Sequence, residues 1–279
     1  MISVVIPVLN GERTIGAQLA ALRDHPIDEF EVVVADNGSS DGTADVVESF
    51  TDSLPVRLVD ASGRRGASAA RNIGAAAAHG DFVVFTDADD VVGRCWLDGW
   101  QRAALHLDFG TGPLAGFVSD QPSPDPTTDT FQLPRHMGFL PYAFGTNFGI
   151  RHDIFDQFGG FDEALATAED VDLSWRLALA GVELHFVTGS LVAVRRKERS
   201  IELMRQYFAY GRSDPLLYKR FRAQGLRRPS AREILRGYGS IVARLPFLGR
   251  ADTRGAWSAQ VGRRAGRLVG SVEAKAFLP

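Results

Sequence analysis

Four short apolar runs alternate with helix-like segments in the first 90 residues, and this alternation restricts the fold more than any other feature. The runs cover residues 2–6, 30–35, 56–59 and 82–85. Each is short and rich in β-branched or aromatic side chains, which is typical of a strand buried in a sheet interior. The segments between them have helical spacing or a helix-favouring composition. Repeated strand–helix units predict an α/β fold with a largely parallel sheet.

Three carboxylates follow the fourth run, at Asp87, Asp89 and Asp90. In an open α/β sheet, ligands bind at the carboxyl ends of strands, so these acids are expected to face a cleft. Carboxylates this close repel one another unless a cation or hydrogen-bond donors lie between them, and Mg²⁺ or Mn²⁺ prefers oxygen ligands. Aspartate is also common in ordinary turns. The acids alone leave a metal site and a polar turn as alternatives.

A second acidic group opens a helix predicted over residues 169–180. Glu169, Asp170 and Asp172 lie in its first turn. Carboxylates are favoured at a helix N-terminus by the helix dipole, which is one explanation of the group. The other is that it supplies a base directed into the cleft.

The net charge of −3 hides an asymmetry, because Lys and Arg outnumber Asp and Glu from Arg195 onward. A basic region of this kind commonly meets phosphates or anionic lipid headgroups. Arginine and tryptophan interleaved with apolar residues suit a membrane surface, and ordinary helix packing explains them equally well. The single cysteine, Cys95, excludes an intramolecular disulfide. Nucleic-acid binding is not expected, since no motif for it is present.

No stretch approaches 18 uninterrupted apolar residues, and the first seven residues lack the basic region of a signal peptide. The expected location is the cytoplasm. The basic C-terminal region extends this expectation to peripheral contact with the inner face of the membrane. Residues 120–130 contain three prolines and three aspartates. They predict a surface loop, and a loop beside a ligand cleft can act as a lid.

Five blocks in a fixed order resemble the family 2 glycosyltransferases, which have the GT-A fold and move a sugar from a nucleotide diphosphate to an acceptor. The blocks are VVIPVLNGERTI, VVVADNGSSDGT, GASAARNIGAAAAHGDFVVFTDADD, GTNFGIRHDIFDQFGGFDE and AEDVDLSWRLALAG. The resemblance implies a GT-A domain over residues 1–220, with a mixed, mainly parallel sheet flanked by helices. Residues 221–279 are then expected to form a basic, helical C-terminal extension.

The resemblance also implies which residues hold the donor. Pro7, Val8 and Glu12 would lie near the nucleotide, and Asp36 would hydrogen-bond the base, because a carboxylate can accept from a uracil imide or a guanine edge. Arg71 would approach the diphosphate, since a guanidinium matches phosphate geometry with two parallel hydrogen bonds. The alternative is an arginine on the helix surface that forms an ion pair.

Roles in the chemistry follow from the same resemblance. Asp87 and Asp89 match the family's DxD element, which implies that Asp87 contacts ribose or metal and Asp89 coordinates Mg²⁺ or Mn²⁺. The ion would stabilise charge that develops on the leaving diphosphate. Asp170 would take the proton from the acceptor hydroxyl, and a single base acting in line predicts inversion at the anomeric carbon. Glu169 would position the acceptor or raise the pKa of the base.

Two departures from the family pattern change these expectations. Many relatives carry a histidine after the last core strand, whereas this chain has Val194-Arg195-Arg196-Lys197. Arg195 or Arg196 is therefore expected to clamp the diphosphate directly, which lessens the reliance on metal. The Gln-x-x-Arg-Trp block of processive members is also missing. The expected enzyme is a hexosyltransferase that adds a single sugar, in cell-envelope or polysaccharide biosynthesis.

Two alternatives belong to other functional classes. A nucleotidyltransferase shares a similar sheet and metal-binding acids, but it needs a Gly-rich, lysine-bearing phosphate loop, of which Asn10-Gly11-Glu12-Arg13 is a poor version. A non-catalytic binder of sugar nucleotides would bind the donor without transfer. The sequence leaves open the donor sugar, the oligomeric state and the acceptor, whether glycan, lipid-linked or small molecule.

Overall fold

The computed structural model describes residues 1–26, 29–117, 133–197 and 199–279, so the loop expected at 120–130 lies outside the described residues. The chain divides into two compact units. The first consists of Met1–His136, Leu140–Ala164 and Glu169–Arg195, and the second of Met137–Phe139, Leu165–Ala168 and Arg196–Pro279. These units divide near Arg195, whereas the domain boundary expected from the sequence lay at residue 220.

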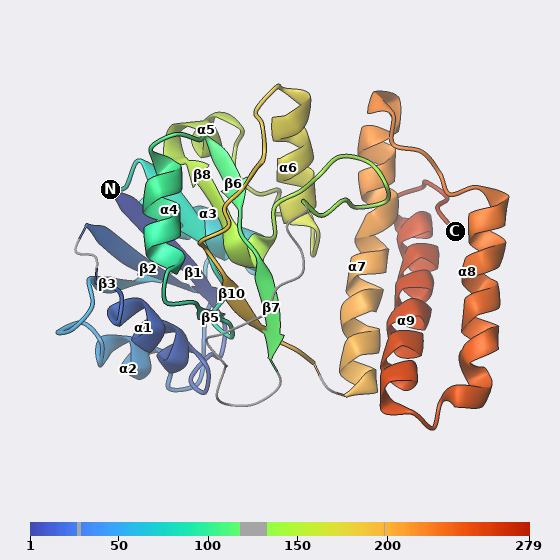
Figure 1. Ribbon diagram of the computed structural model, residues 1–279, viewed down its shortest axis with the longest axis horizontal. Coiled ribbons are helices and arrows are strands. Elements are labelled where there is room, and N and C mark those ends of the chain that lie inside the picture. The colour runs from blue at the N-terminus through green and yellow to red at the C-terminus, as the bar shows by residue number, and fades with distance from the viewer. Residues whose placement is uncertain (27–28, 118–132, 198) are drawn as a thin grey trace. The chain divides into compact units, whose positions relative to one another are not determined.

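A mixed sheet forms the centre of the first unit, with strand order β3-β2-β1-β4-β8-β6-β9 among the described residues (Figure 1). The first four strands in this order are parallel, and β8 runs antiparallel to β4 and β6. This arrangement confirms the predicted mixed, mainly parallel sheet. The strands are β1 (Ile2–Val8), β2 (Phe30–Asp36), β3 (Val56–Asp60), β4 (Phe82–Phe85), β6 (Phe109–Thr111), β8 (Phe148–Arg151) and β9 (His185–Phe186).

A second, smaller sheet was not predicted. It has the order β5-β10-β7, with β5 (Val91–Val92), β7 (Leu114–Phe117) and β10 (Val192–Arg195). Runs of two to four residues carry too little periodicity to reveal their pairing partners.

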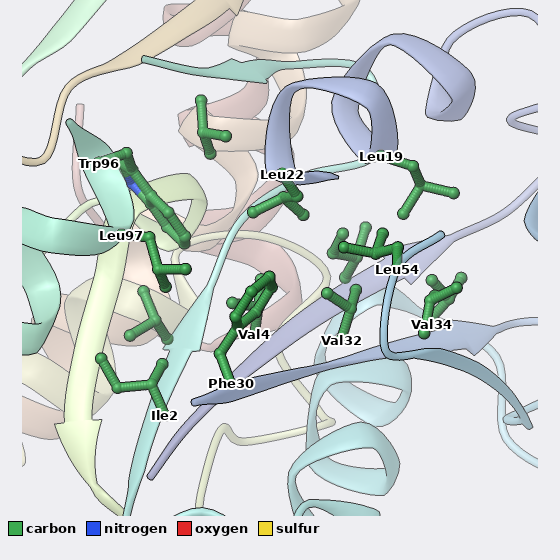
Figure 2. Packing of buried hydrophobic residues seen from close by; sticks show 14 of the residues in the cluster. Ile2, Val4, Leu19, Leu22, Phe30, Val32, Val34, Leu54, Trp96 and Leu97 are labelled. Atoms are coloured by element: carbon green, nitrogen blue, oxygen red, sulfur yellow. The ribbon is translucent and has the colours of Figure 1, made fainter. Parts of the chain in front are cut away.

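Helices supply the residues that cover the large sheet. They are α1 (Ile15–Arg23), α2 (Thr43–Glu48), α3 (Ala67–Ala77), α4 (Trp96–Ala104), α5 (His152–Gln157) and α6 (Glu169–Leu179). One core cluster joins α1 and α4 to the sheet, and Figure 2 shows Leu19, Leu22, Trp96 and Leu97 around the strand residue Val4. A second cluster contains the neighbouring Val5 together with residues of α3, α5 and α6. Successive strand residues point to opposite faces, so β1, β2 and β4 each contribute to both clusters.

Pro7 lies inside β1, although the sequence interpretation ended the strand there. The carbonyl of Val5 accepts a hydrogen bond from the N–H of Thr86, at 3.2 Å, on the β4 side of the strand. Residues two apart in a strand direct their backbone groups to the same side. The backbone nitrogen of Pro7, which carries no hydrogen, therefore faces the side where β4 has already ended at Phe85. For this reason β1 loses no hydrogen bond to β4 at Pro7.

The second unit is built mainly from α7 (Ser200–Phe221), α8 (Ala231–Arg244) and α9 (Ala251–Glu273), which confirms the predicted C-terminal helices. α7 and α9 pack with their backbones close together. A Cβ atom added at Gly266 of α9 would lie only 2.1 Å from the carbonyl oxygen of Phe208 in α7. Gly262 and Gly270, one turn away on either side, approach the α7 backbone in the same way. Only glycine fits these positions without moving a helix.

Charged side chains also join α7 to α9. Asp214 of α7 is fully buried and accepts hydrogen bonds from Arg263 at 3.0 Å and Arg267 at 2.7 Å, both from α9. Two cations around one buried carboxylate offset the cost of removing it from water. Helix packing therefore accounts for part of the basic C-terminal region. Among the described residues, no helix has the length and apolar character needed to cross a lipid bilayer.

Candidate active site

The carboxyl-terminal edge of the large sheet gathers the residues expected to hold a nucleoside. Val8 at the end of β1 is in register with Asp36 at the end of β2, which is in register with Asp60 of β3. Val8 is buried, Pro7 and Asp36 are half-buried, and Glu12 in the following loop is exposed. The four predicted residues thus lie at or just beyond one sheet edge, where α/β proteins bind ligands.

Hydrogen bonds connect the loops that follow β1 and β2. Asp36 Oδ1 accepts from the backbone N–H of Ser39 at 2.9 Å and from its hydroxyl at 2.6 Å. The side chain of Asn10 accepts from the N–H of Ser40 at 2.8 Å. Glu12 accepts from the N–H of Gly42 at 3.3 Å. Asp36 and Glu12 are therefore held in place by their neighbours before any ligand binds.

Arg71 links the acid of the DxD element to the acids of α6. It is buried on α3, and its two terminal nitrogens donate to Asp87 Oδ1 and Glu169 Oε1, both at 2.6 Å. Burial alone would lower the pKa of Arg71, but the charges of Asp87 and Glu169 raise it above its ordinary value, so the guanidinium stays charged. The sequence placed Arg71 at a diphosphate. In the structure its terminal nitrogens bind carboxylates, with about a third of the Asp87 side chain still exposed (34%).

Asp170 is the half-buried acid next to this bridge. The backbone N–H of Gly145 donates to Asp170 Oδ2 at 2.8 Å, and the N–H of Val171 donates to Oδ1 at 2.8 Å. Burial, followed by the nearby charge of Glu169, raises the pKa of Asp170 to about 7. A carboxylate with this pKa can accept a proton near neutral pH, as a general base must.

The third acid of the DxD loop, Asp90, is buried where β5 and β10 meet. It accepts hydrogen bonds from the hydroxyl of Thr146 and from the N–H of Arg195, the latter at 3.0 Å. Burial, then the charge of Asp87, raises the pKa of Asp90 to about 7. Arg195 Nε also reaches the carbonyl of Asp89 at 3.4 Å. The predicted diphosphate clamp Arg195 thus lies directly beside the DxD loop.

Sequence reasoning missed Gln18, which supports this loop from α1. Its side-chain nitrogen donates to Thr86 Oγ1 at 3.0 Å, and its oxygen accepts from the N–H of Val92 at 2.9 Å. Gln18 is fully buried on the same face as Ile15 and Leu22. A polar residue on an otherwise apolar helical stripe was the available signal, because buried polar side chains are nearly always hydrogen-bonded.

The carboxylates of the DxD loop are candidate ligands for a metal ion. Among the described residues, no group of three or more His, Cys, Asp or Glu side chains is arranged to hold one. Mg²⁺ sites in phosphate-binding enzymes commonly use one or two carboxylates and take their other ligands from substrate phosphates and water. Asp87 and the half-buried Asp89 provide two carboxylates on one loop. The donor set therefore fits an ion that arrives with a diphosphate.

Comparison with known proteins gives consistent matches. Residues 3–159 match the family model described as glycosyl transferase family 2. The chain is 27% identical over 228 residues to the glycosyltransferase AglE of Haloferax volcanii, an alignment that covers 76% of this chain and 72% of AglE. It spans only 47% and 57% of the length of two other curated relatives.

Two solved structures have a similar fold. One is Staphylococcus aureus TarS, residues 1–349, in complex with UDP-GlcNAc, with a TM-score of 0.56 and 18% identity over 96% of this chain and 91% of that chain. The other is the mannosyltransferase PcManGT from Pyrobaculum calidifontis in complex with GDP-Man and Mn²⁺. Its TM-score is 0.58, with 18% identity over 98% of this chain and 75% of that chain.

Proposed function

This chain belongs to glycosyl transferase family 2, and from that premise we propose that it transfers one hexose from a nucleotide-diphosphate donor to an acceptor hydroxyl, with inversion. Its GT-A fold is confirmed by the likeness to TarS and PcManGT. The observation that carries the proposal is the bridge through Arg71. One buried cation connects Asp87 of the DxD element with Glu169, whose neighbour Asp170 has the pKa of a base.

The donor half of the site lies along the ends of β1, β2 and β4. Asp36 is a hydrogen-bond acceptor for the base, while Pro7 and Val8 line the adjacent edge. The likeness to structures that contain UDP-GlcNAc and GDP-Man supports a nucleotide-sugar donor and leaves uridine and guanosine as candidates. Arg195, beside the DxD loop, supplies positive charge for the diphosphate.

A divalent ion is part of the proposal. Asp89 and Asp87 would hold it, and Mg²⁺ or Mn²⁺ would supply Lewis-acid stabilisation of the leaving diphosphate. The Mn²⁺ in PcManGT supports this assignment. Arg71 donates a hydrogen bond to Asp87 Oδ1 at 2.6 Å, so that one of the carboxylate oxygens is fixed before the donor arrives.

Asp170 performs the proton transfer. The acceptor hydroxyl attacks the anomeric carbon from the face opposite the diphosphate, its proton passes to Asp170, and the bond to the diphosphate oxygen breaks. Attack from the opposite face inverts the configuration. The N–H groups of Gly145 and Val171 orient the carboxylate for this step. Glu169 acts through its charge, which adds to the effect of burial in raising the pKa of Asp170 to about 7.

Calorimetric titration with UDP, TDP and GDP tests the donor site, each nucleotide being added with Mn²⁺ and again with excess chelator. We expect one nucleotide to bind, and removal of the metal to weaken binding at least about tenfold, since Asp87 and Asp89 would hold an ion that favours the charged diphosphate. Asp89→Asn should remove the metal-dependent part of the affinity. Asp52→Asn, at an exposed position, is the matched control and should bind as the wild type does.

Three other results would change the proposal. Binding that is independent of metal but lost in Arg195→Gln would assign the diphosphate to Arg195. Absence of binding to all three nucleotides would overturn a nucleotide-sugar donor. Release of pyrophosphate from a sugar phosphate and a nucleoside triphosphate would instead favour the nucleotidyltransferase.

The pH dependence of transfer reports on the base. Because the pKa of Asp170 is about 7, we expect kcat/KM to rise as the pH increases through 7 and to level off above it, as Asp170 loses its proton. Glu169→Gln removes the like charge and should move this rise to lower pH. A profile that is flat between pH 5 and 8, about the range over which such a group titrates, would contradict the assignment.

A further inference from the structure

Helix α8 differs from the helices around it because none of its residues is buried. It begins with a complete capping box, in which Ser230 and Glu233 exchange hydrogen bonds with each other's backbone. Its hydrophobic residues are numerous nonetheless. The apolar face of α8 is therefore left largely uncovered by the described residues of the second unit.

The exposed apolar residues of α8 and its C-terminus have a regular spacing. Leu235, Tyr238, Val242 and Leu245 are exposed by 73%, 39%, 64% and 48%, and they follow one another at intervals of three or four residues. At 3.6 residues per turn they fall within an arc of about 80°. We call these four residues the α8 stripe. An adjoining side of the helix packs on α9, where Trp257 donates a hydrogen bond to the carbonyl of Ile241 at 3.2 Å. At the edge of the stripe, Arg264 of α9 lies over the ring of Tyr238, 4.4 Å from its centroid.

Cations border the α8 stripe. Arg232 and Arg236 are exposed on the flank next to it. Glu233 is the only acidic residue of α8, and it lies on the far side of the helix in the capping box. Residues 196–279 carry nineteen Lys and Arg but only six Asp and Glu. An exposed apolar stripe with basic flanks on a strongly cationic unit is the pattern of a helix that lies in a membrane interface.

We propose that α8 binds the surface of an anionic lipid bilayer, parallel to the membrane plane, with the α8 stripe inserted at the boundary between headgroups and acyl chains. Arg232 and Arg236 then contact lipid phosphates. Charge selects this occupant over a second copy of the chain, because two copies joined through α8 would bring together two units that each have a large excess of positive charge. An anionic membrane offers opposite charge along the whole stripe.

Co-sedimentation of the full chain with vesicles tests the proposal. We expect binding to vesicles of phosphatidylcholine with phosphatidylglycerol, weaker binding at high salt, and little binding to phosphatidylcholine alone. Arg232→Gln with Arg236→Gln should lower partitioning about thirtyfold, since each basic residue near an anionic surface contributes about fivefold. Leu235→Ser with Val242→Ser leaves the charge unchanged and should lower it at least about tenfold.

Matched controls use equally exposed residues of the first unit. Leu105→Ser removes a leucine that is 76% exposed, and Arg94→Gln with Arg65→Gln removes two exposed cations. Both should bind vesicles as the wild type does, and the circular dichroism of every variant should match that of the wild type. Equal binding of the stripe variants and the wild type would overturn the proposal, as would no binding to anionic vesicles. A dimer in solution that Leu235→Ser with Val242→Ser dissociates would assign the stripe to a second copy instead.

Discussion

Replacing Asp170 by Asn should reduce the rate of sugar transfer about a thousandfold, within the range that a general base contributes, while nucleotide binding stays close to that of the wild type. The amide has nearly the same shape as the carboxylate, and its oxygen can still accept the hydrogen bond from Gly145. It cannot take up the proton of the acceptor. Release of nucleoside diphosphate in the presence of acceptor measures the rate, and calorimetry measures the binding.

A matched control shows whether this loss is specific to the base. Asp156→Asn changes an exposed aspartate of α5 in the same unit and should leave the rate unchanged. If Asp170→Asn turned over as fast as the wild type, Asp170 would have no role as the base. If it bound nucleotide much more weakly, the carboxylate would belong to the donor site.

Arg71→Met should lower the free energy of unfolding of the first unit by about 3 kcal/mol, because it leaves two carboxylates near each other without their shared cation. Urea denaturation followed by tryptophan fluorescence measures the change. Trp96, Trp100 and Trp175 report on the first unit, and Trp257→Phe in the background removes the signal of the second.

Two further variants isolate the cause. Arg102→Met removes an exposed ion pair with Asp98, one turn away on α4, and should change stability by less than about 1 kcal/mol. Adding Glu169→Gln to Arg71→Met should recover part of the lost stability, since it removes one of the uncompensated charges. A loss in Arg71→Met no larger than that in Arg102→Met would contradict the view that the bridge organises the site.

Much of the first unit could be predicted from sequence because local pattern and global fold agree there. The runs that became β1 to β4 were recognised by their β-branched residues. Asp87 and Asp170 were recognised as candidate site residues because Asp87 follows the end of a strand and Asp170 lies at the start of a helix. The placement of Pro7, Val8, Glu12 and Asp36 near the nucleotide followed from the family resemblance. Their position at one sheet edge agrees with the rule that parallel strands bring their carboxyl ends to the same edge.

Other features depend on contacts between distant residues, which a single sequence does not reveal. Arg71 was expected at a phosphate, and nothing local to α3 indicated that Asp87 and Glu169 would both reach it. Asp90 looked like a third acid of the loop until Thr146 and Arg195 were seen to satisfy it. For α8, the sequence predicted only that residues 221–279 form a basic, helical extension, and it could not show that an apolar face of this helix stays uncovered.

The glycines between α7 and α9 repeat every four residues, so a slide of one helix by a full turn would again place glycine opposite backbone. Steric fit alone therefore leaves several alignments of nearly equal quality. Asp214 resolves the ambiguity, because a one-turn slide would take away one of its two arginines, and it would also part Arg212 from Glu273, now 2.7 Å apart. Glycines therefore allow α7 and α9 to pack closely, and a few charged side chains determine which of the possible axial alignments the two helices adopt.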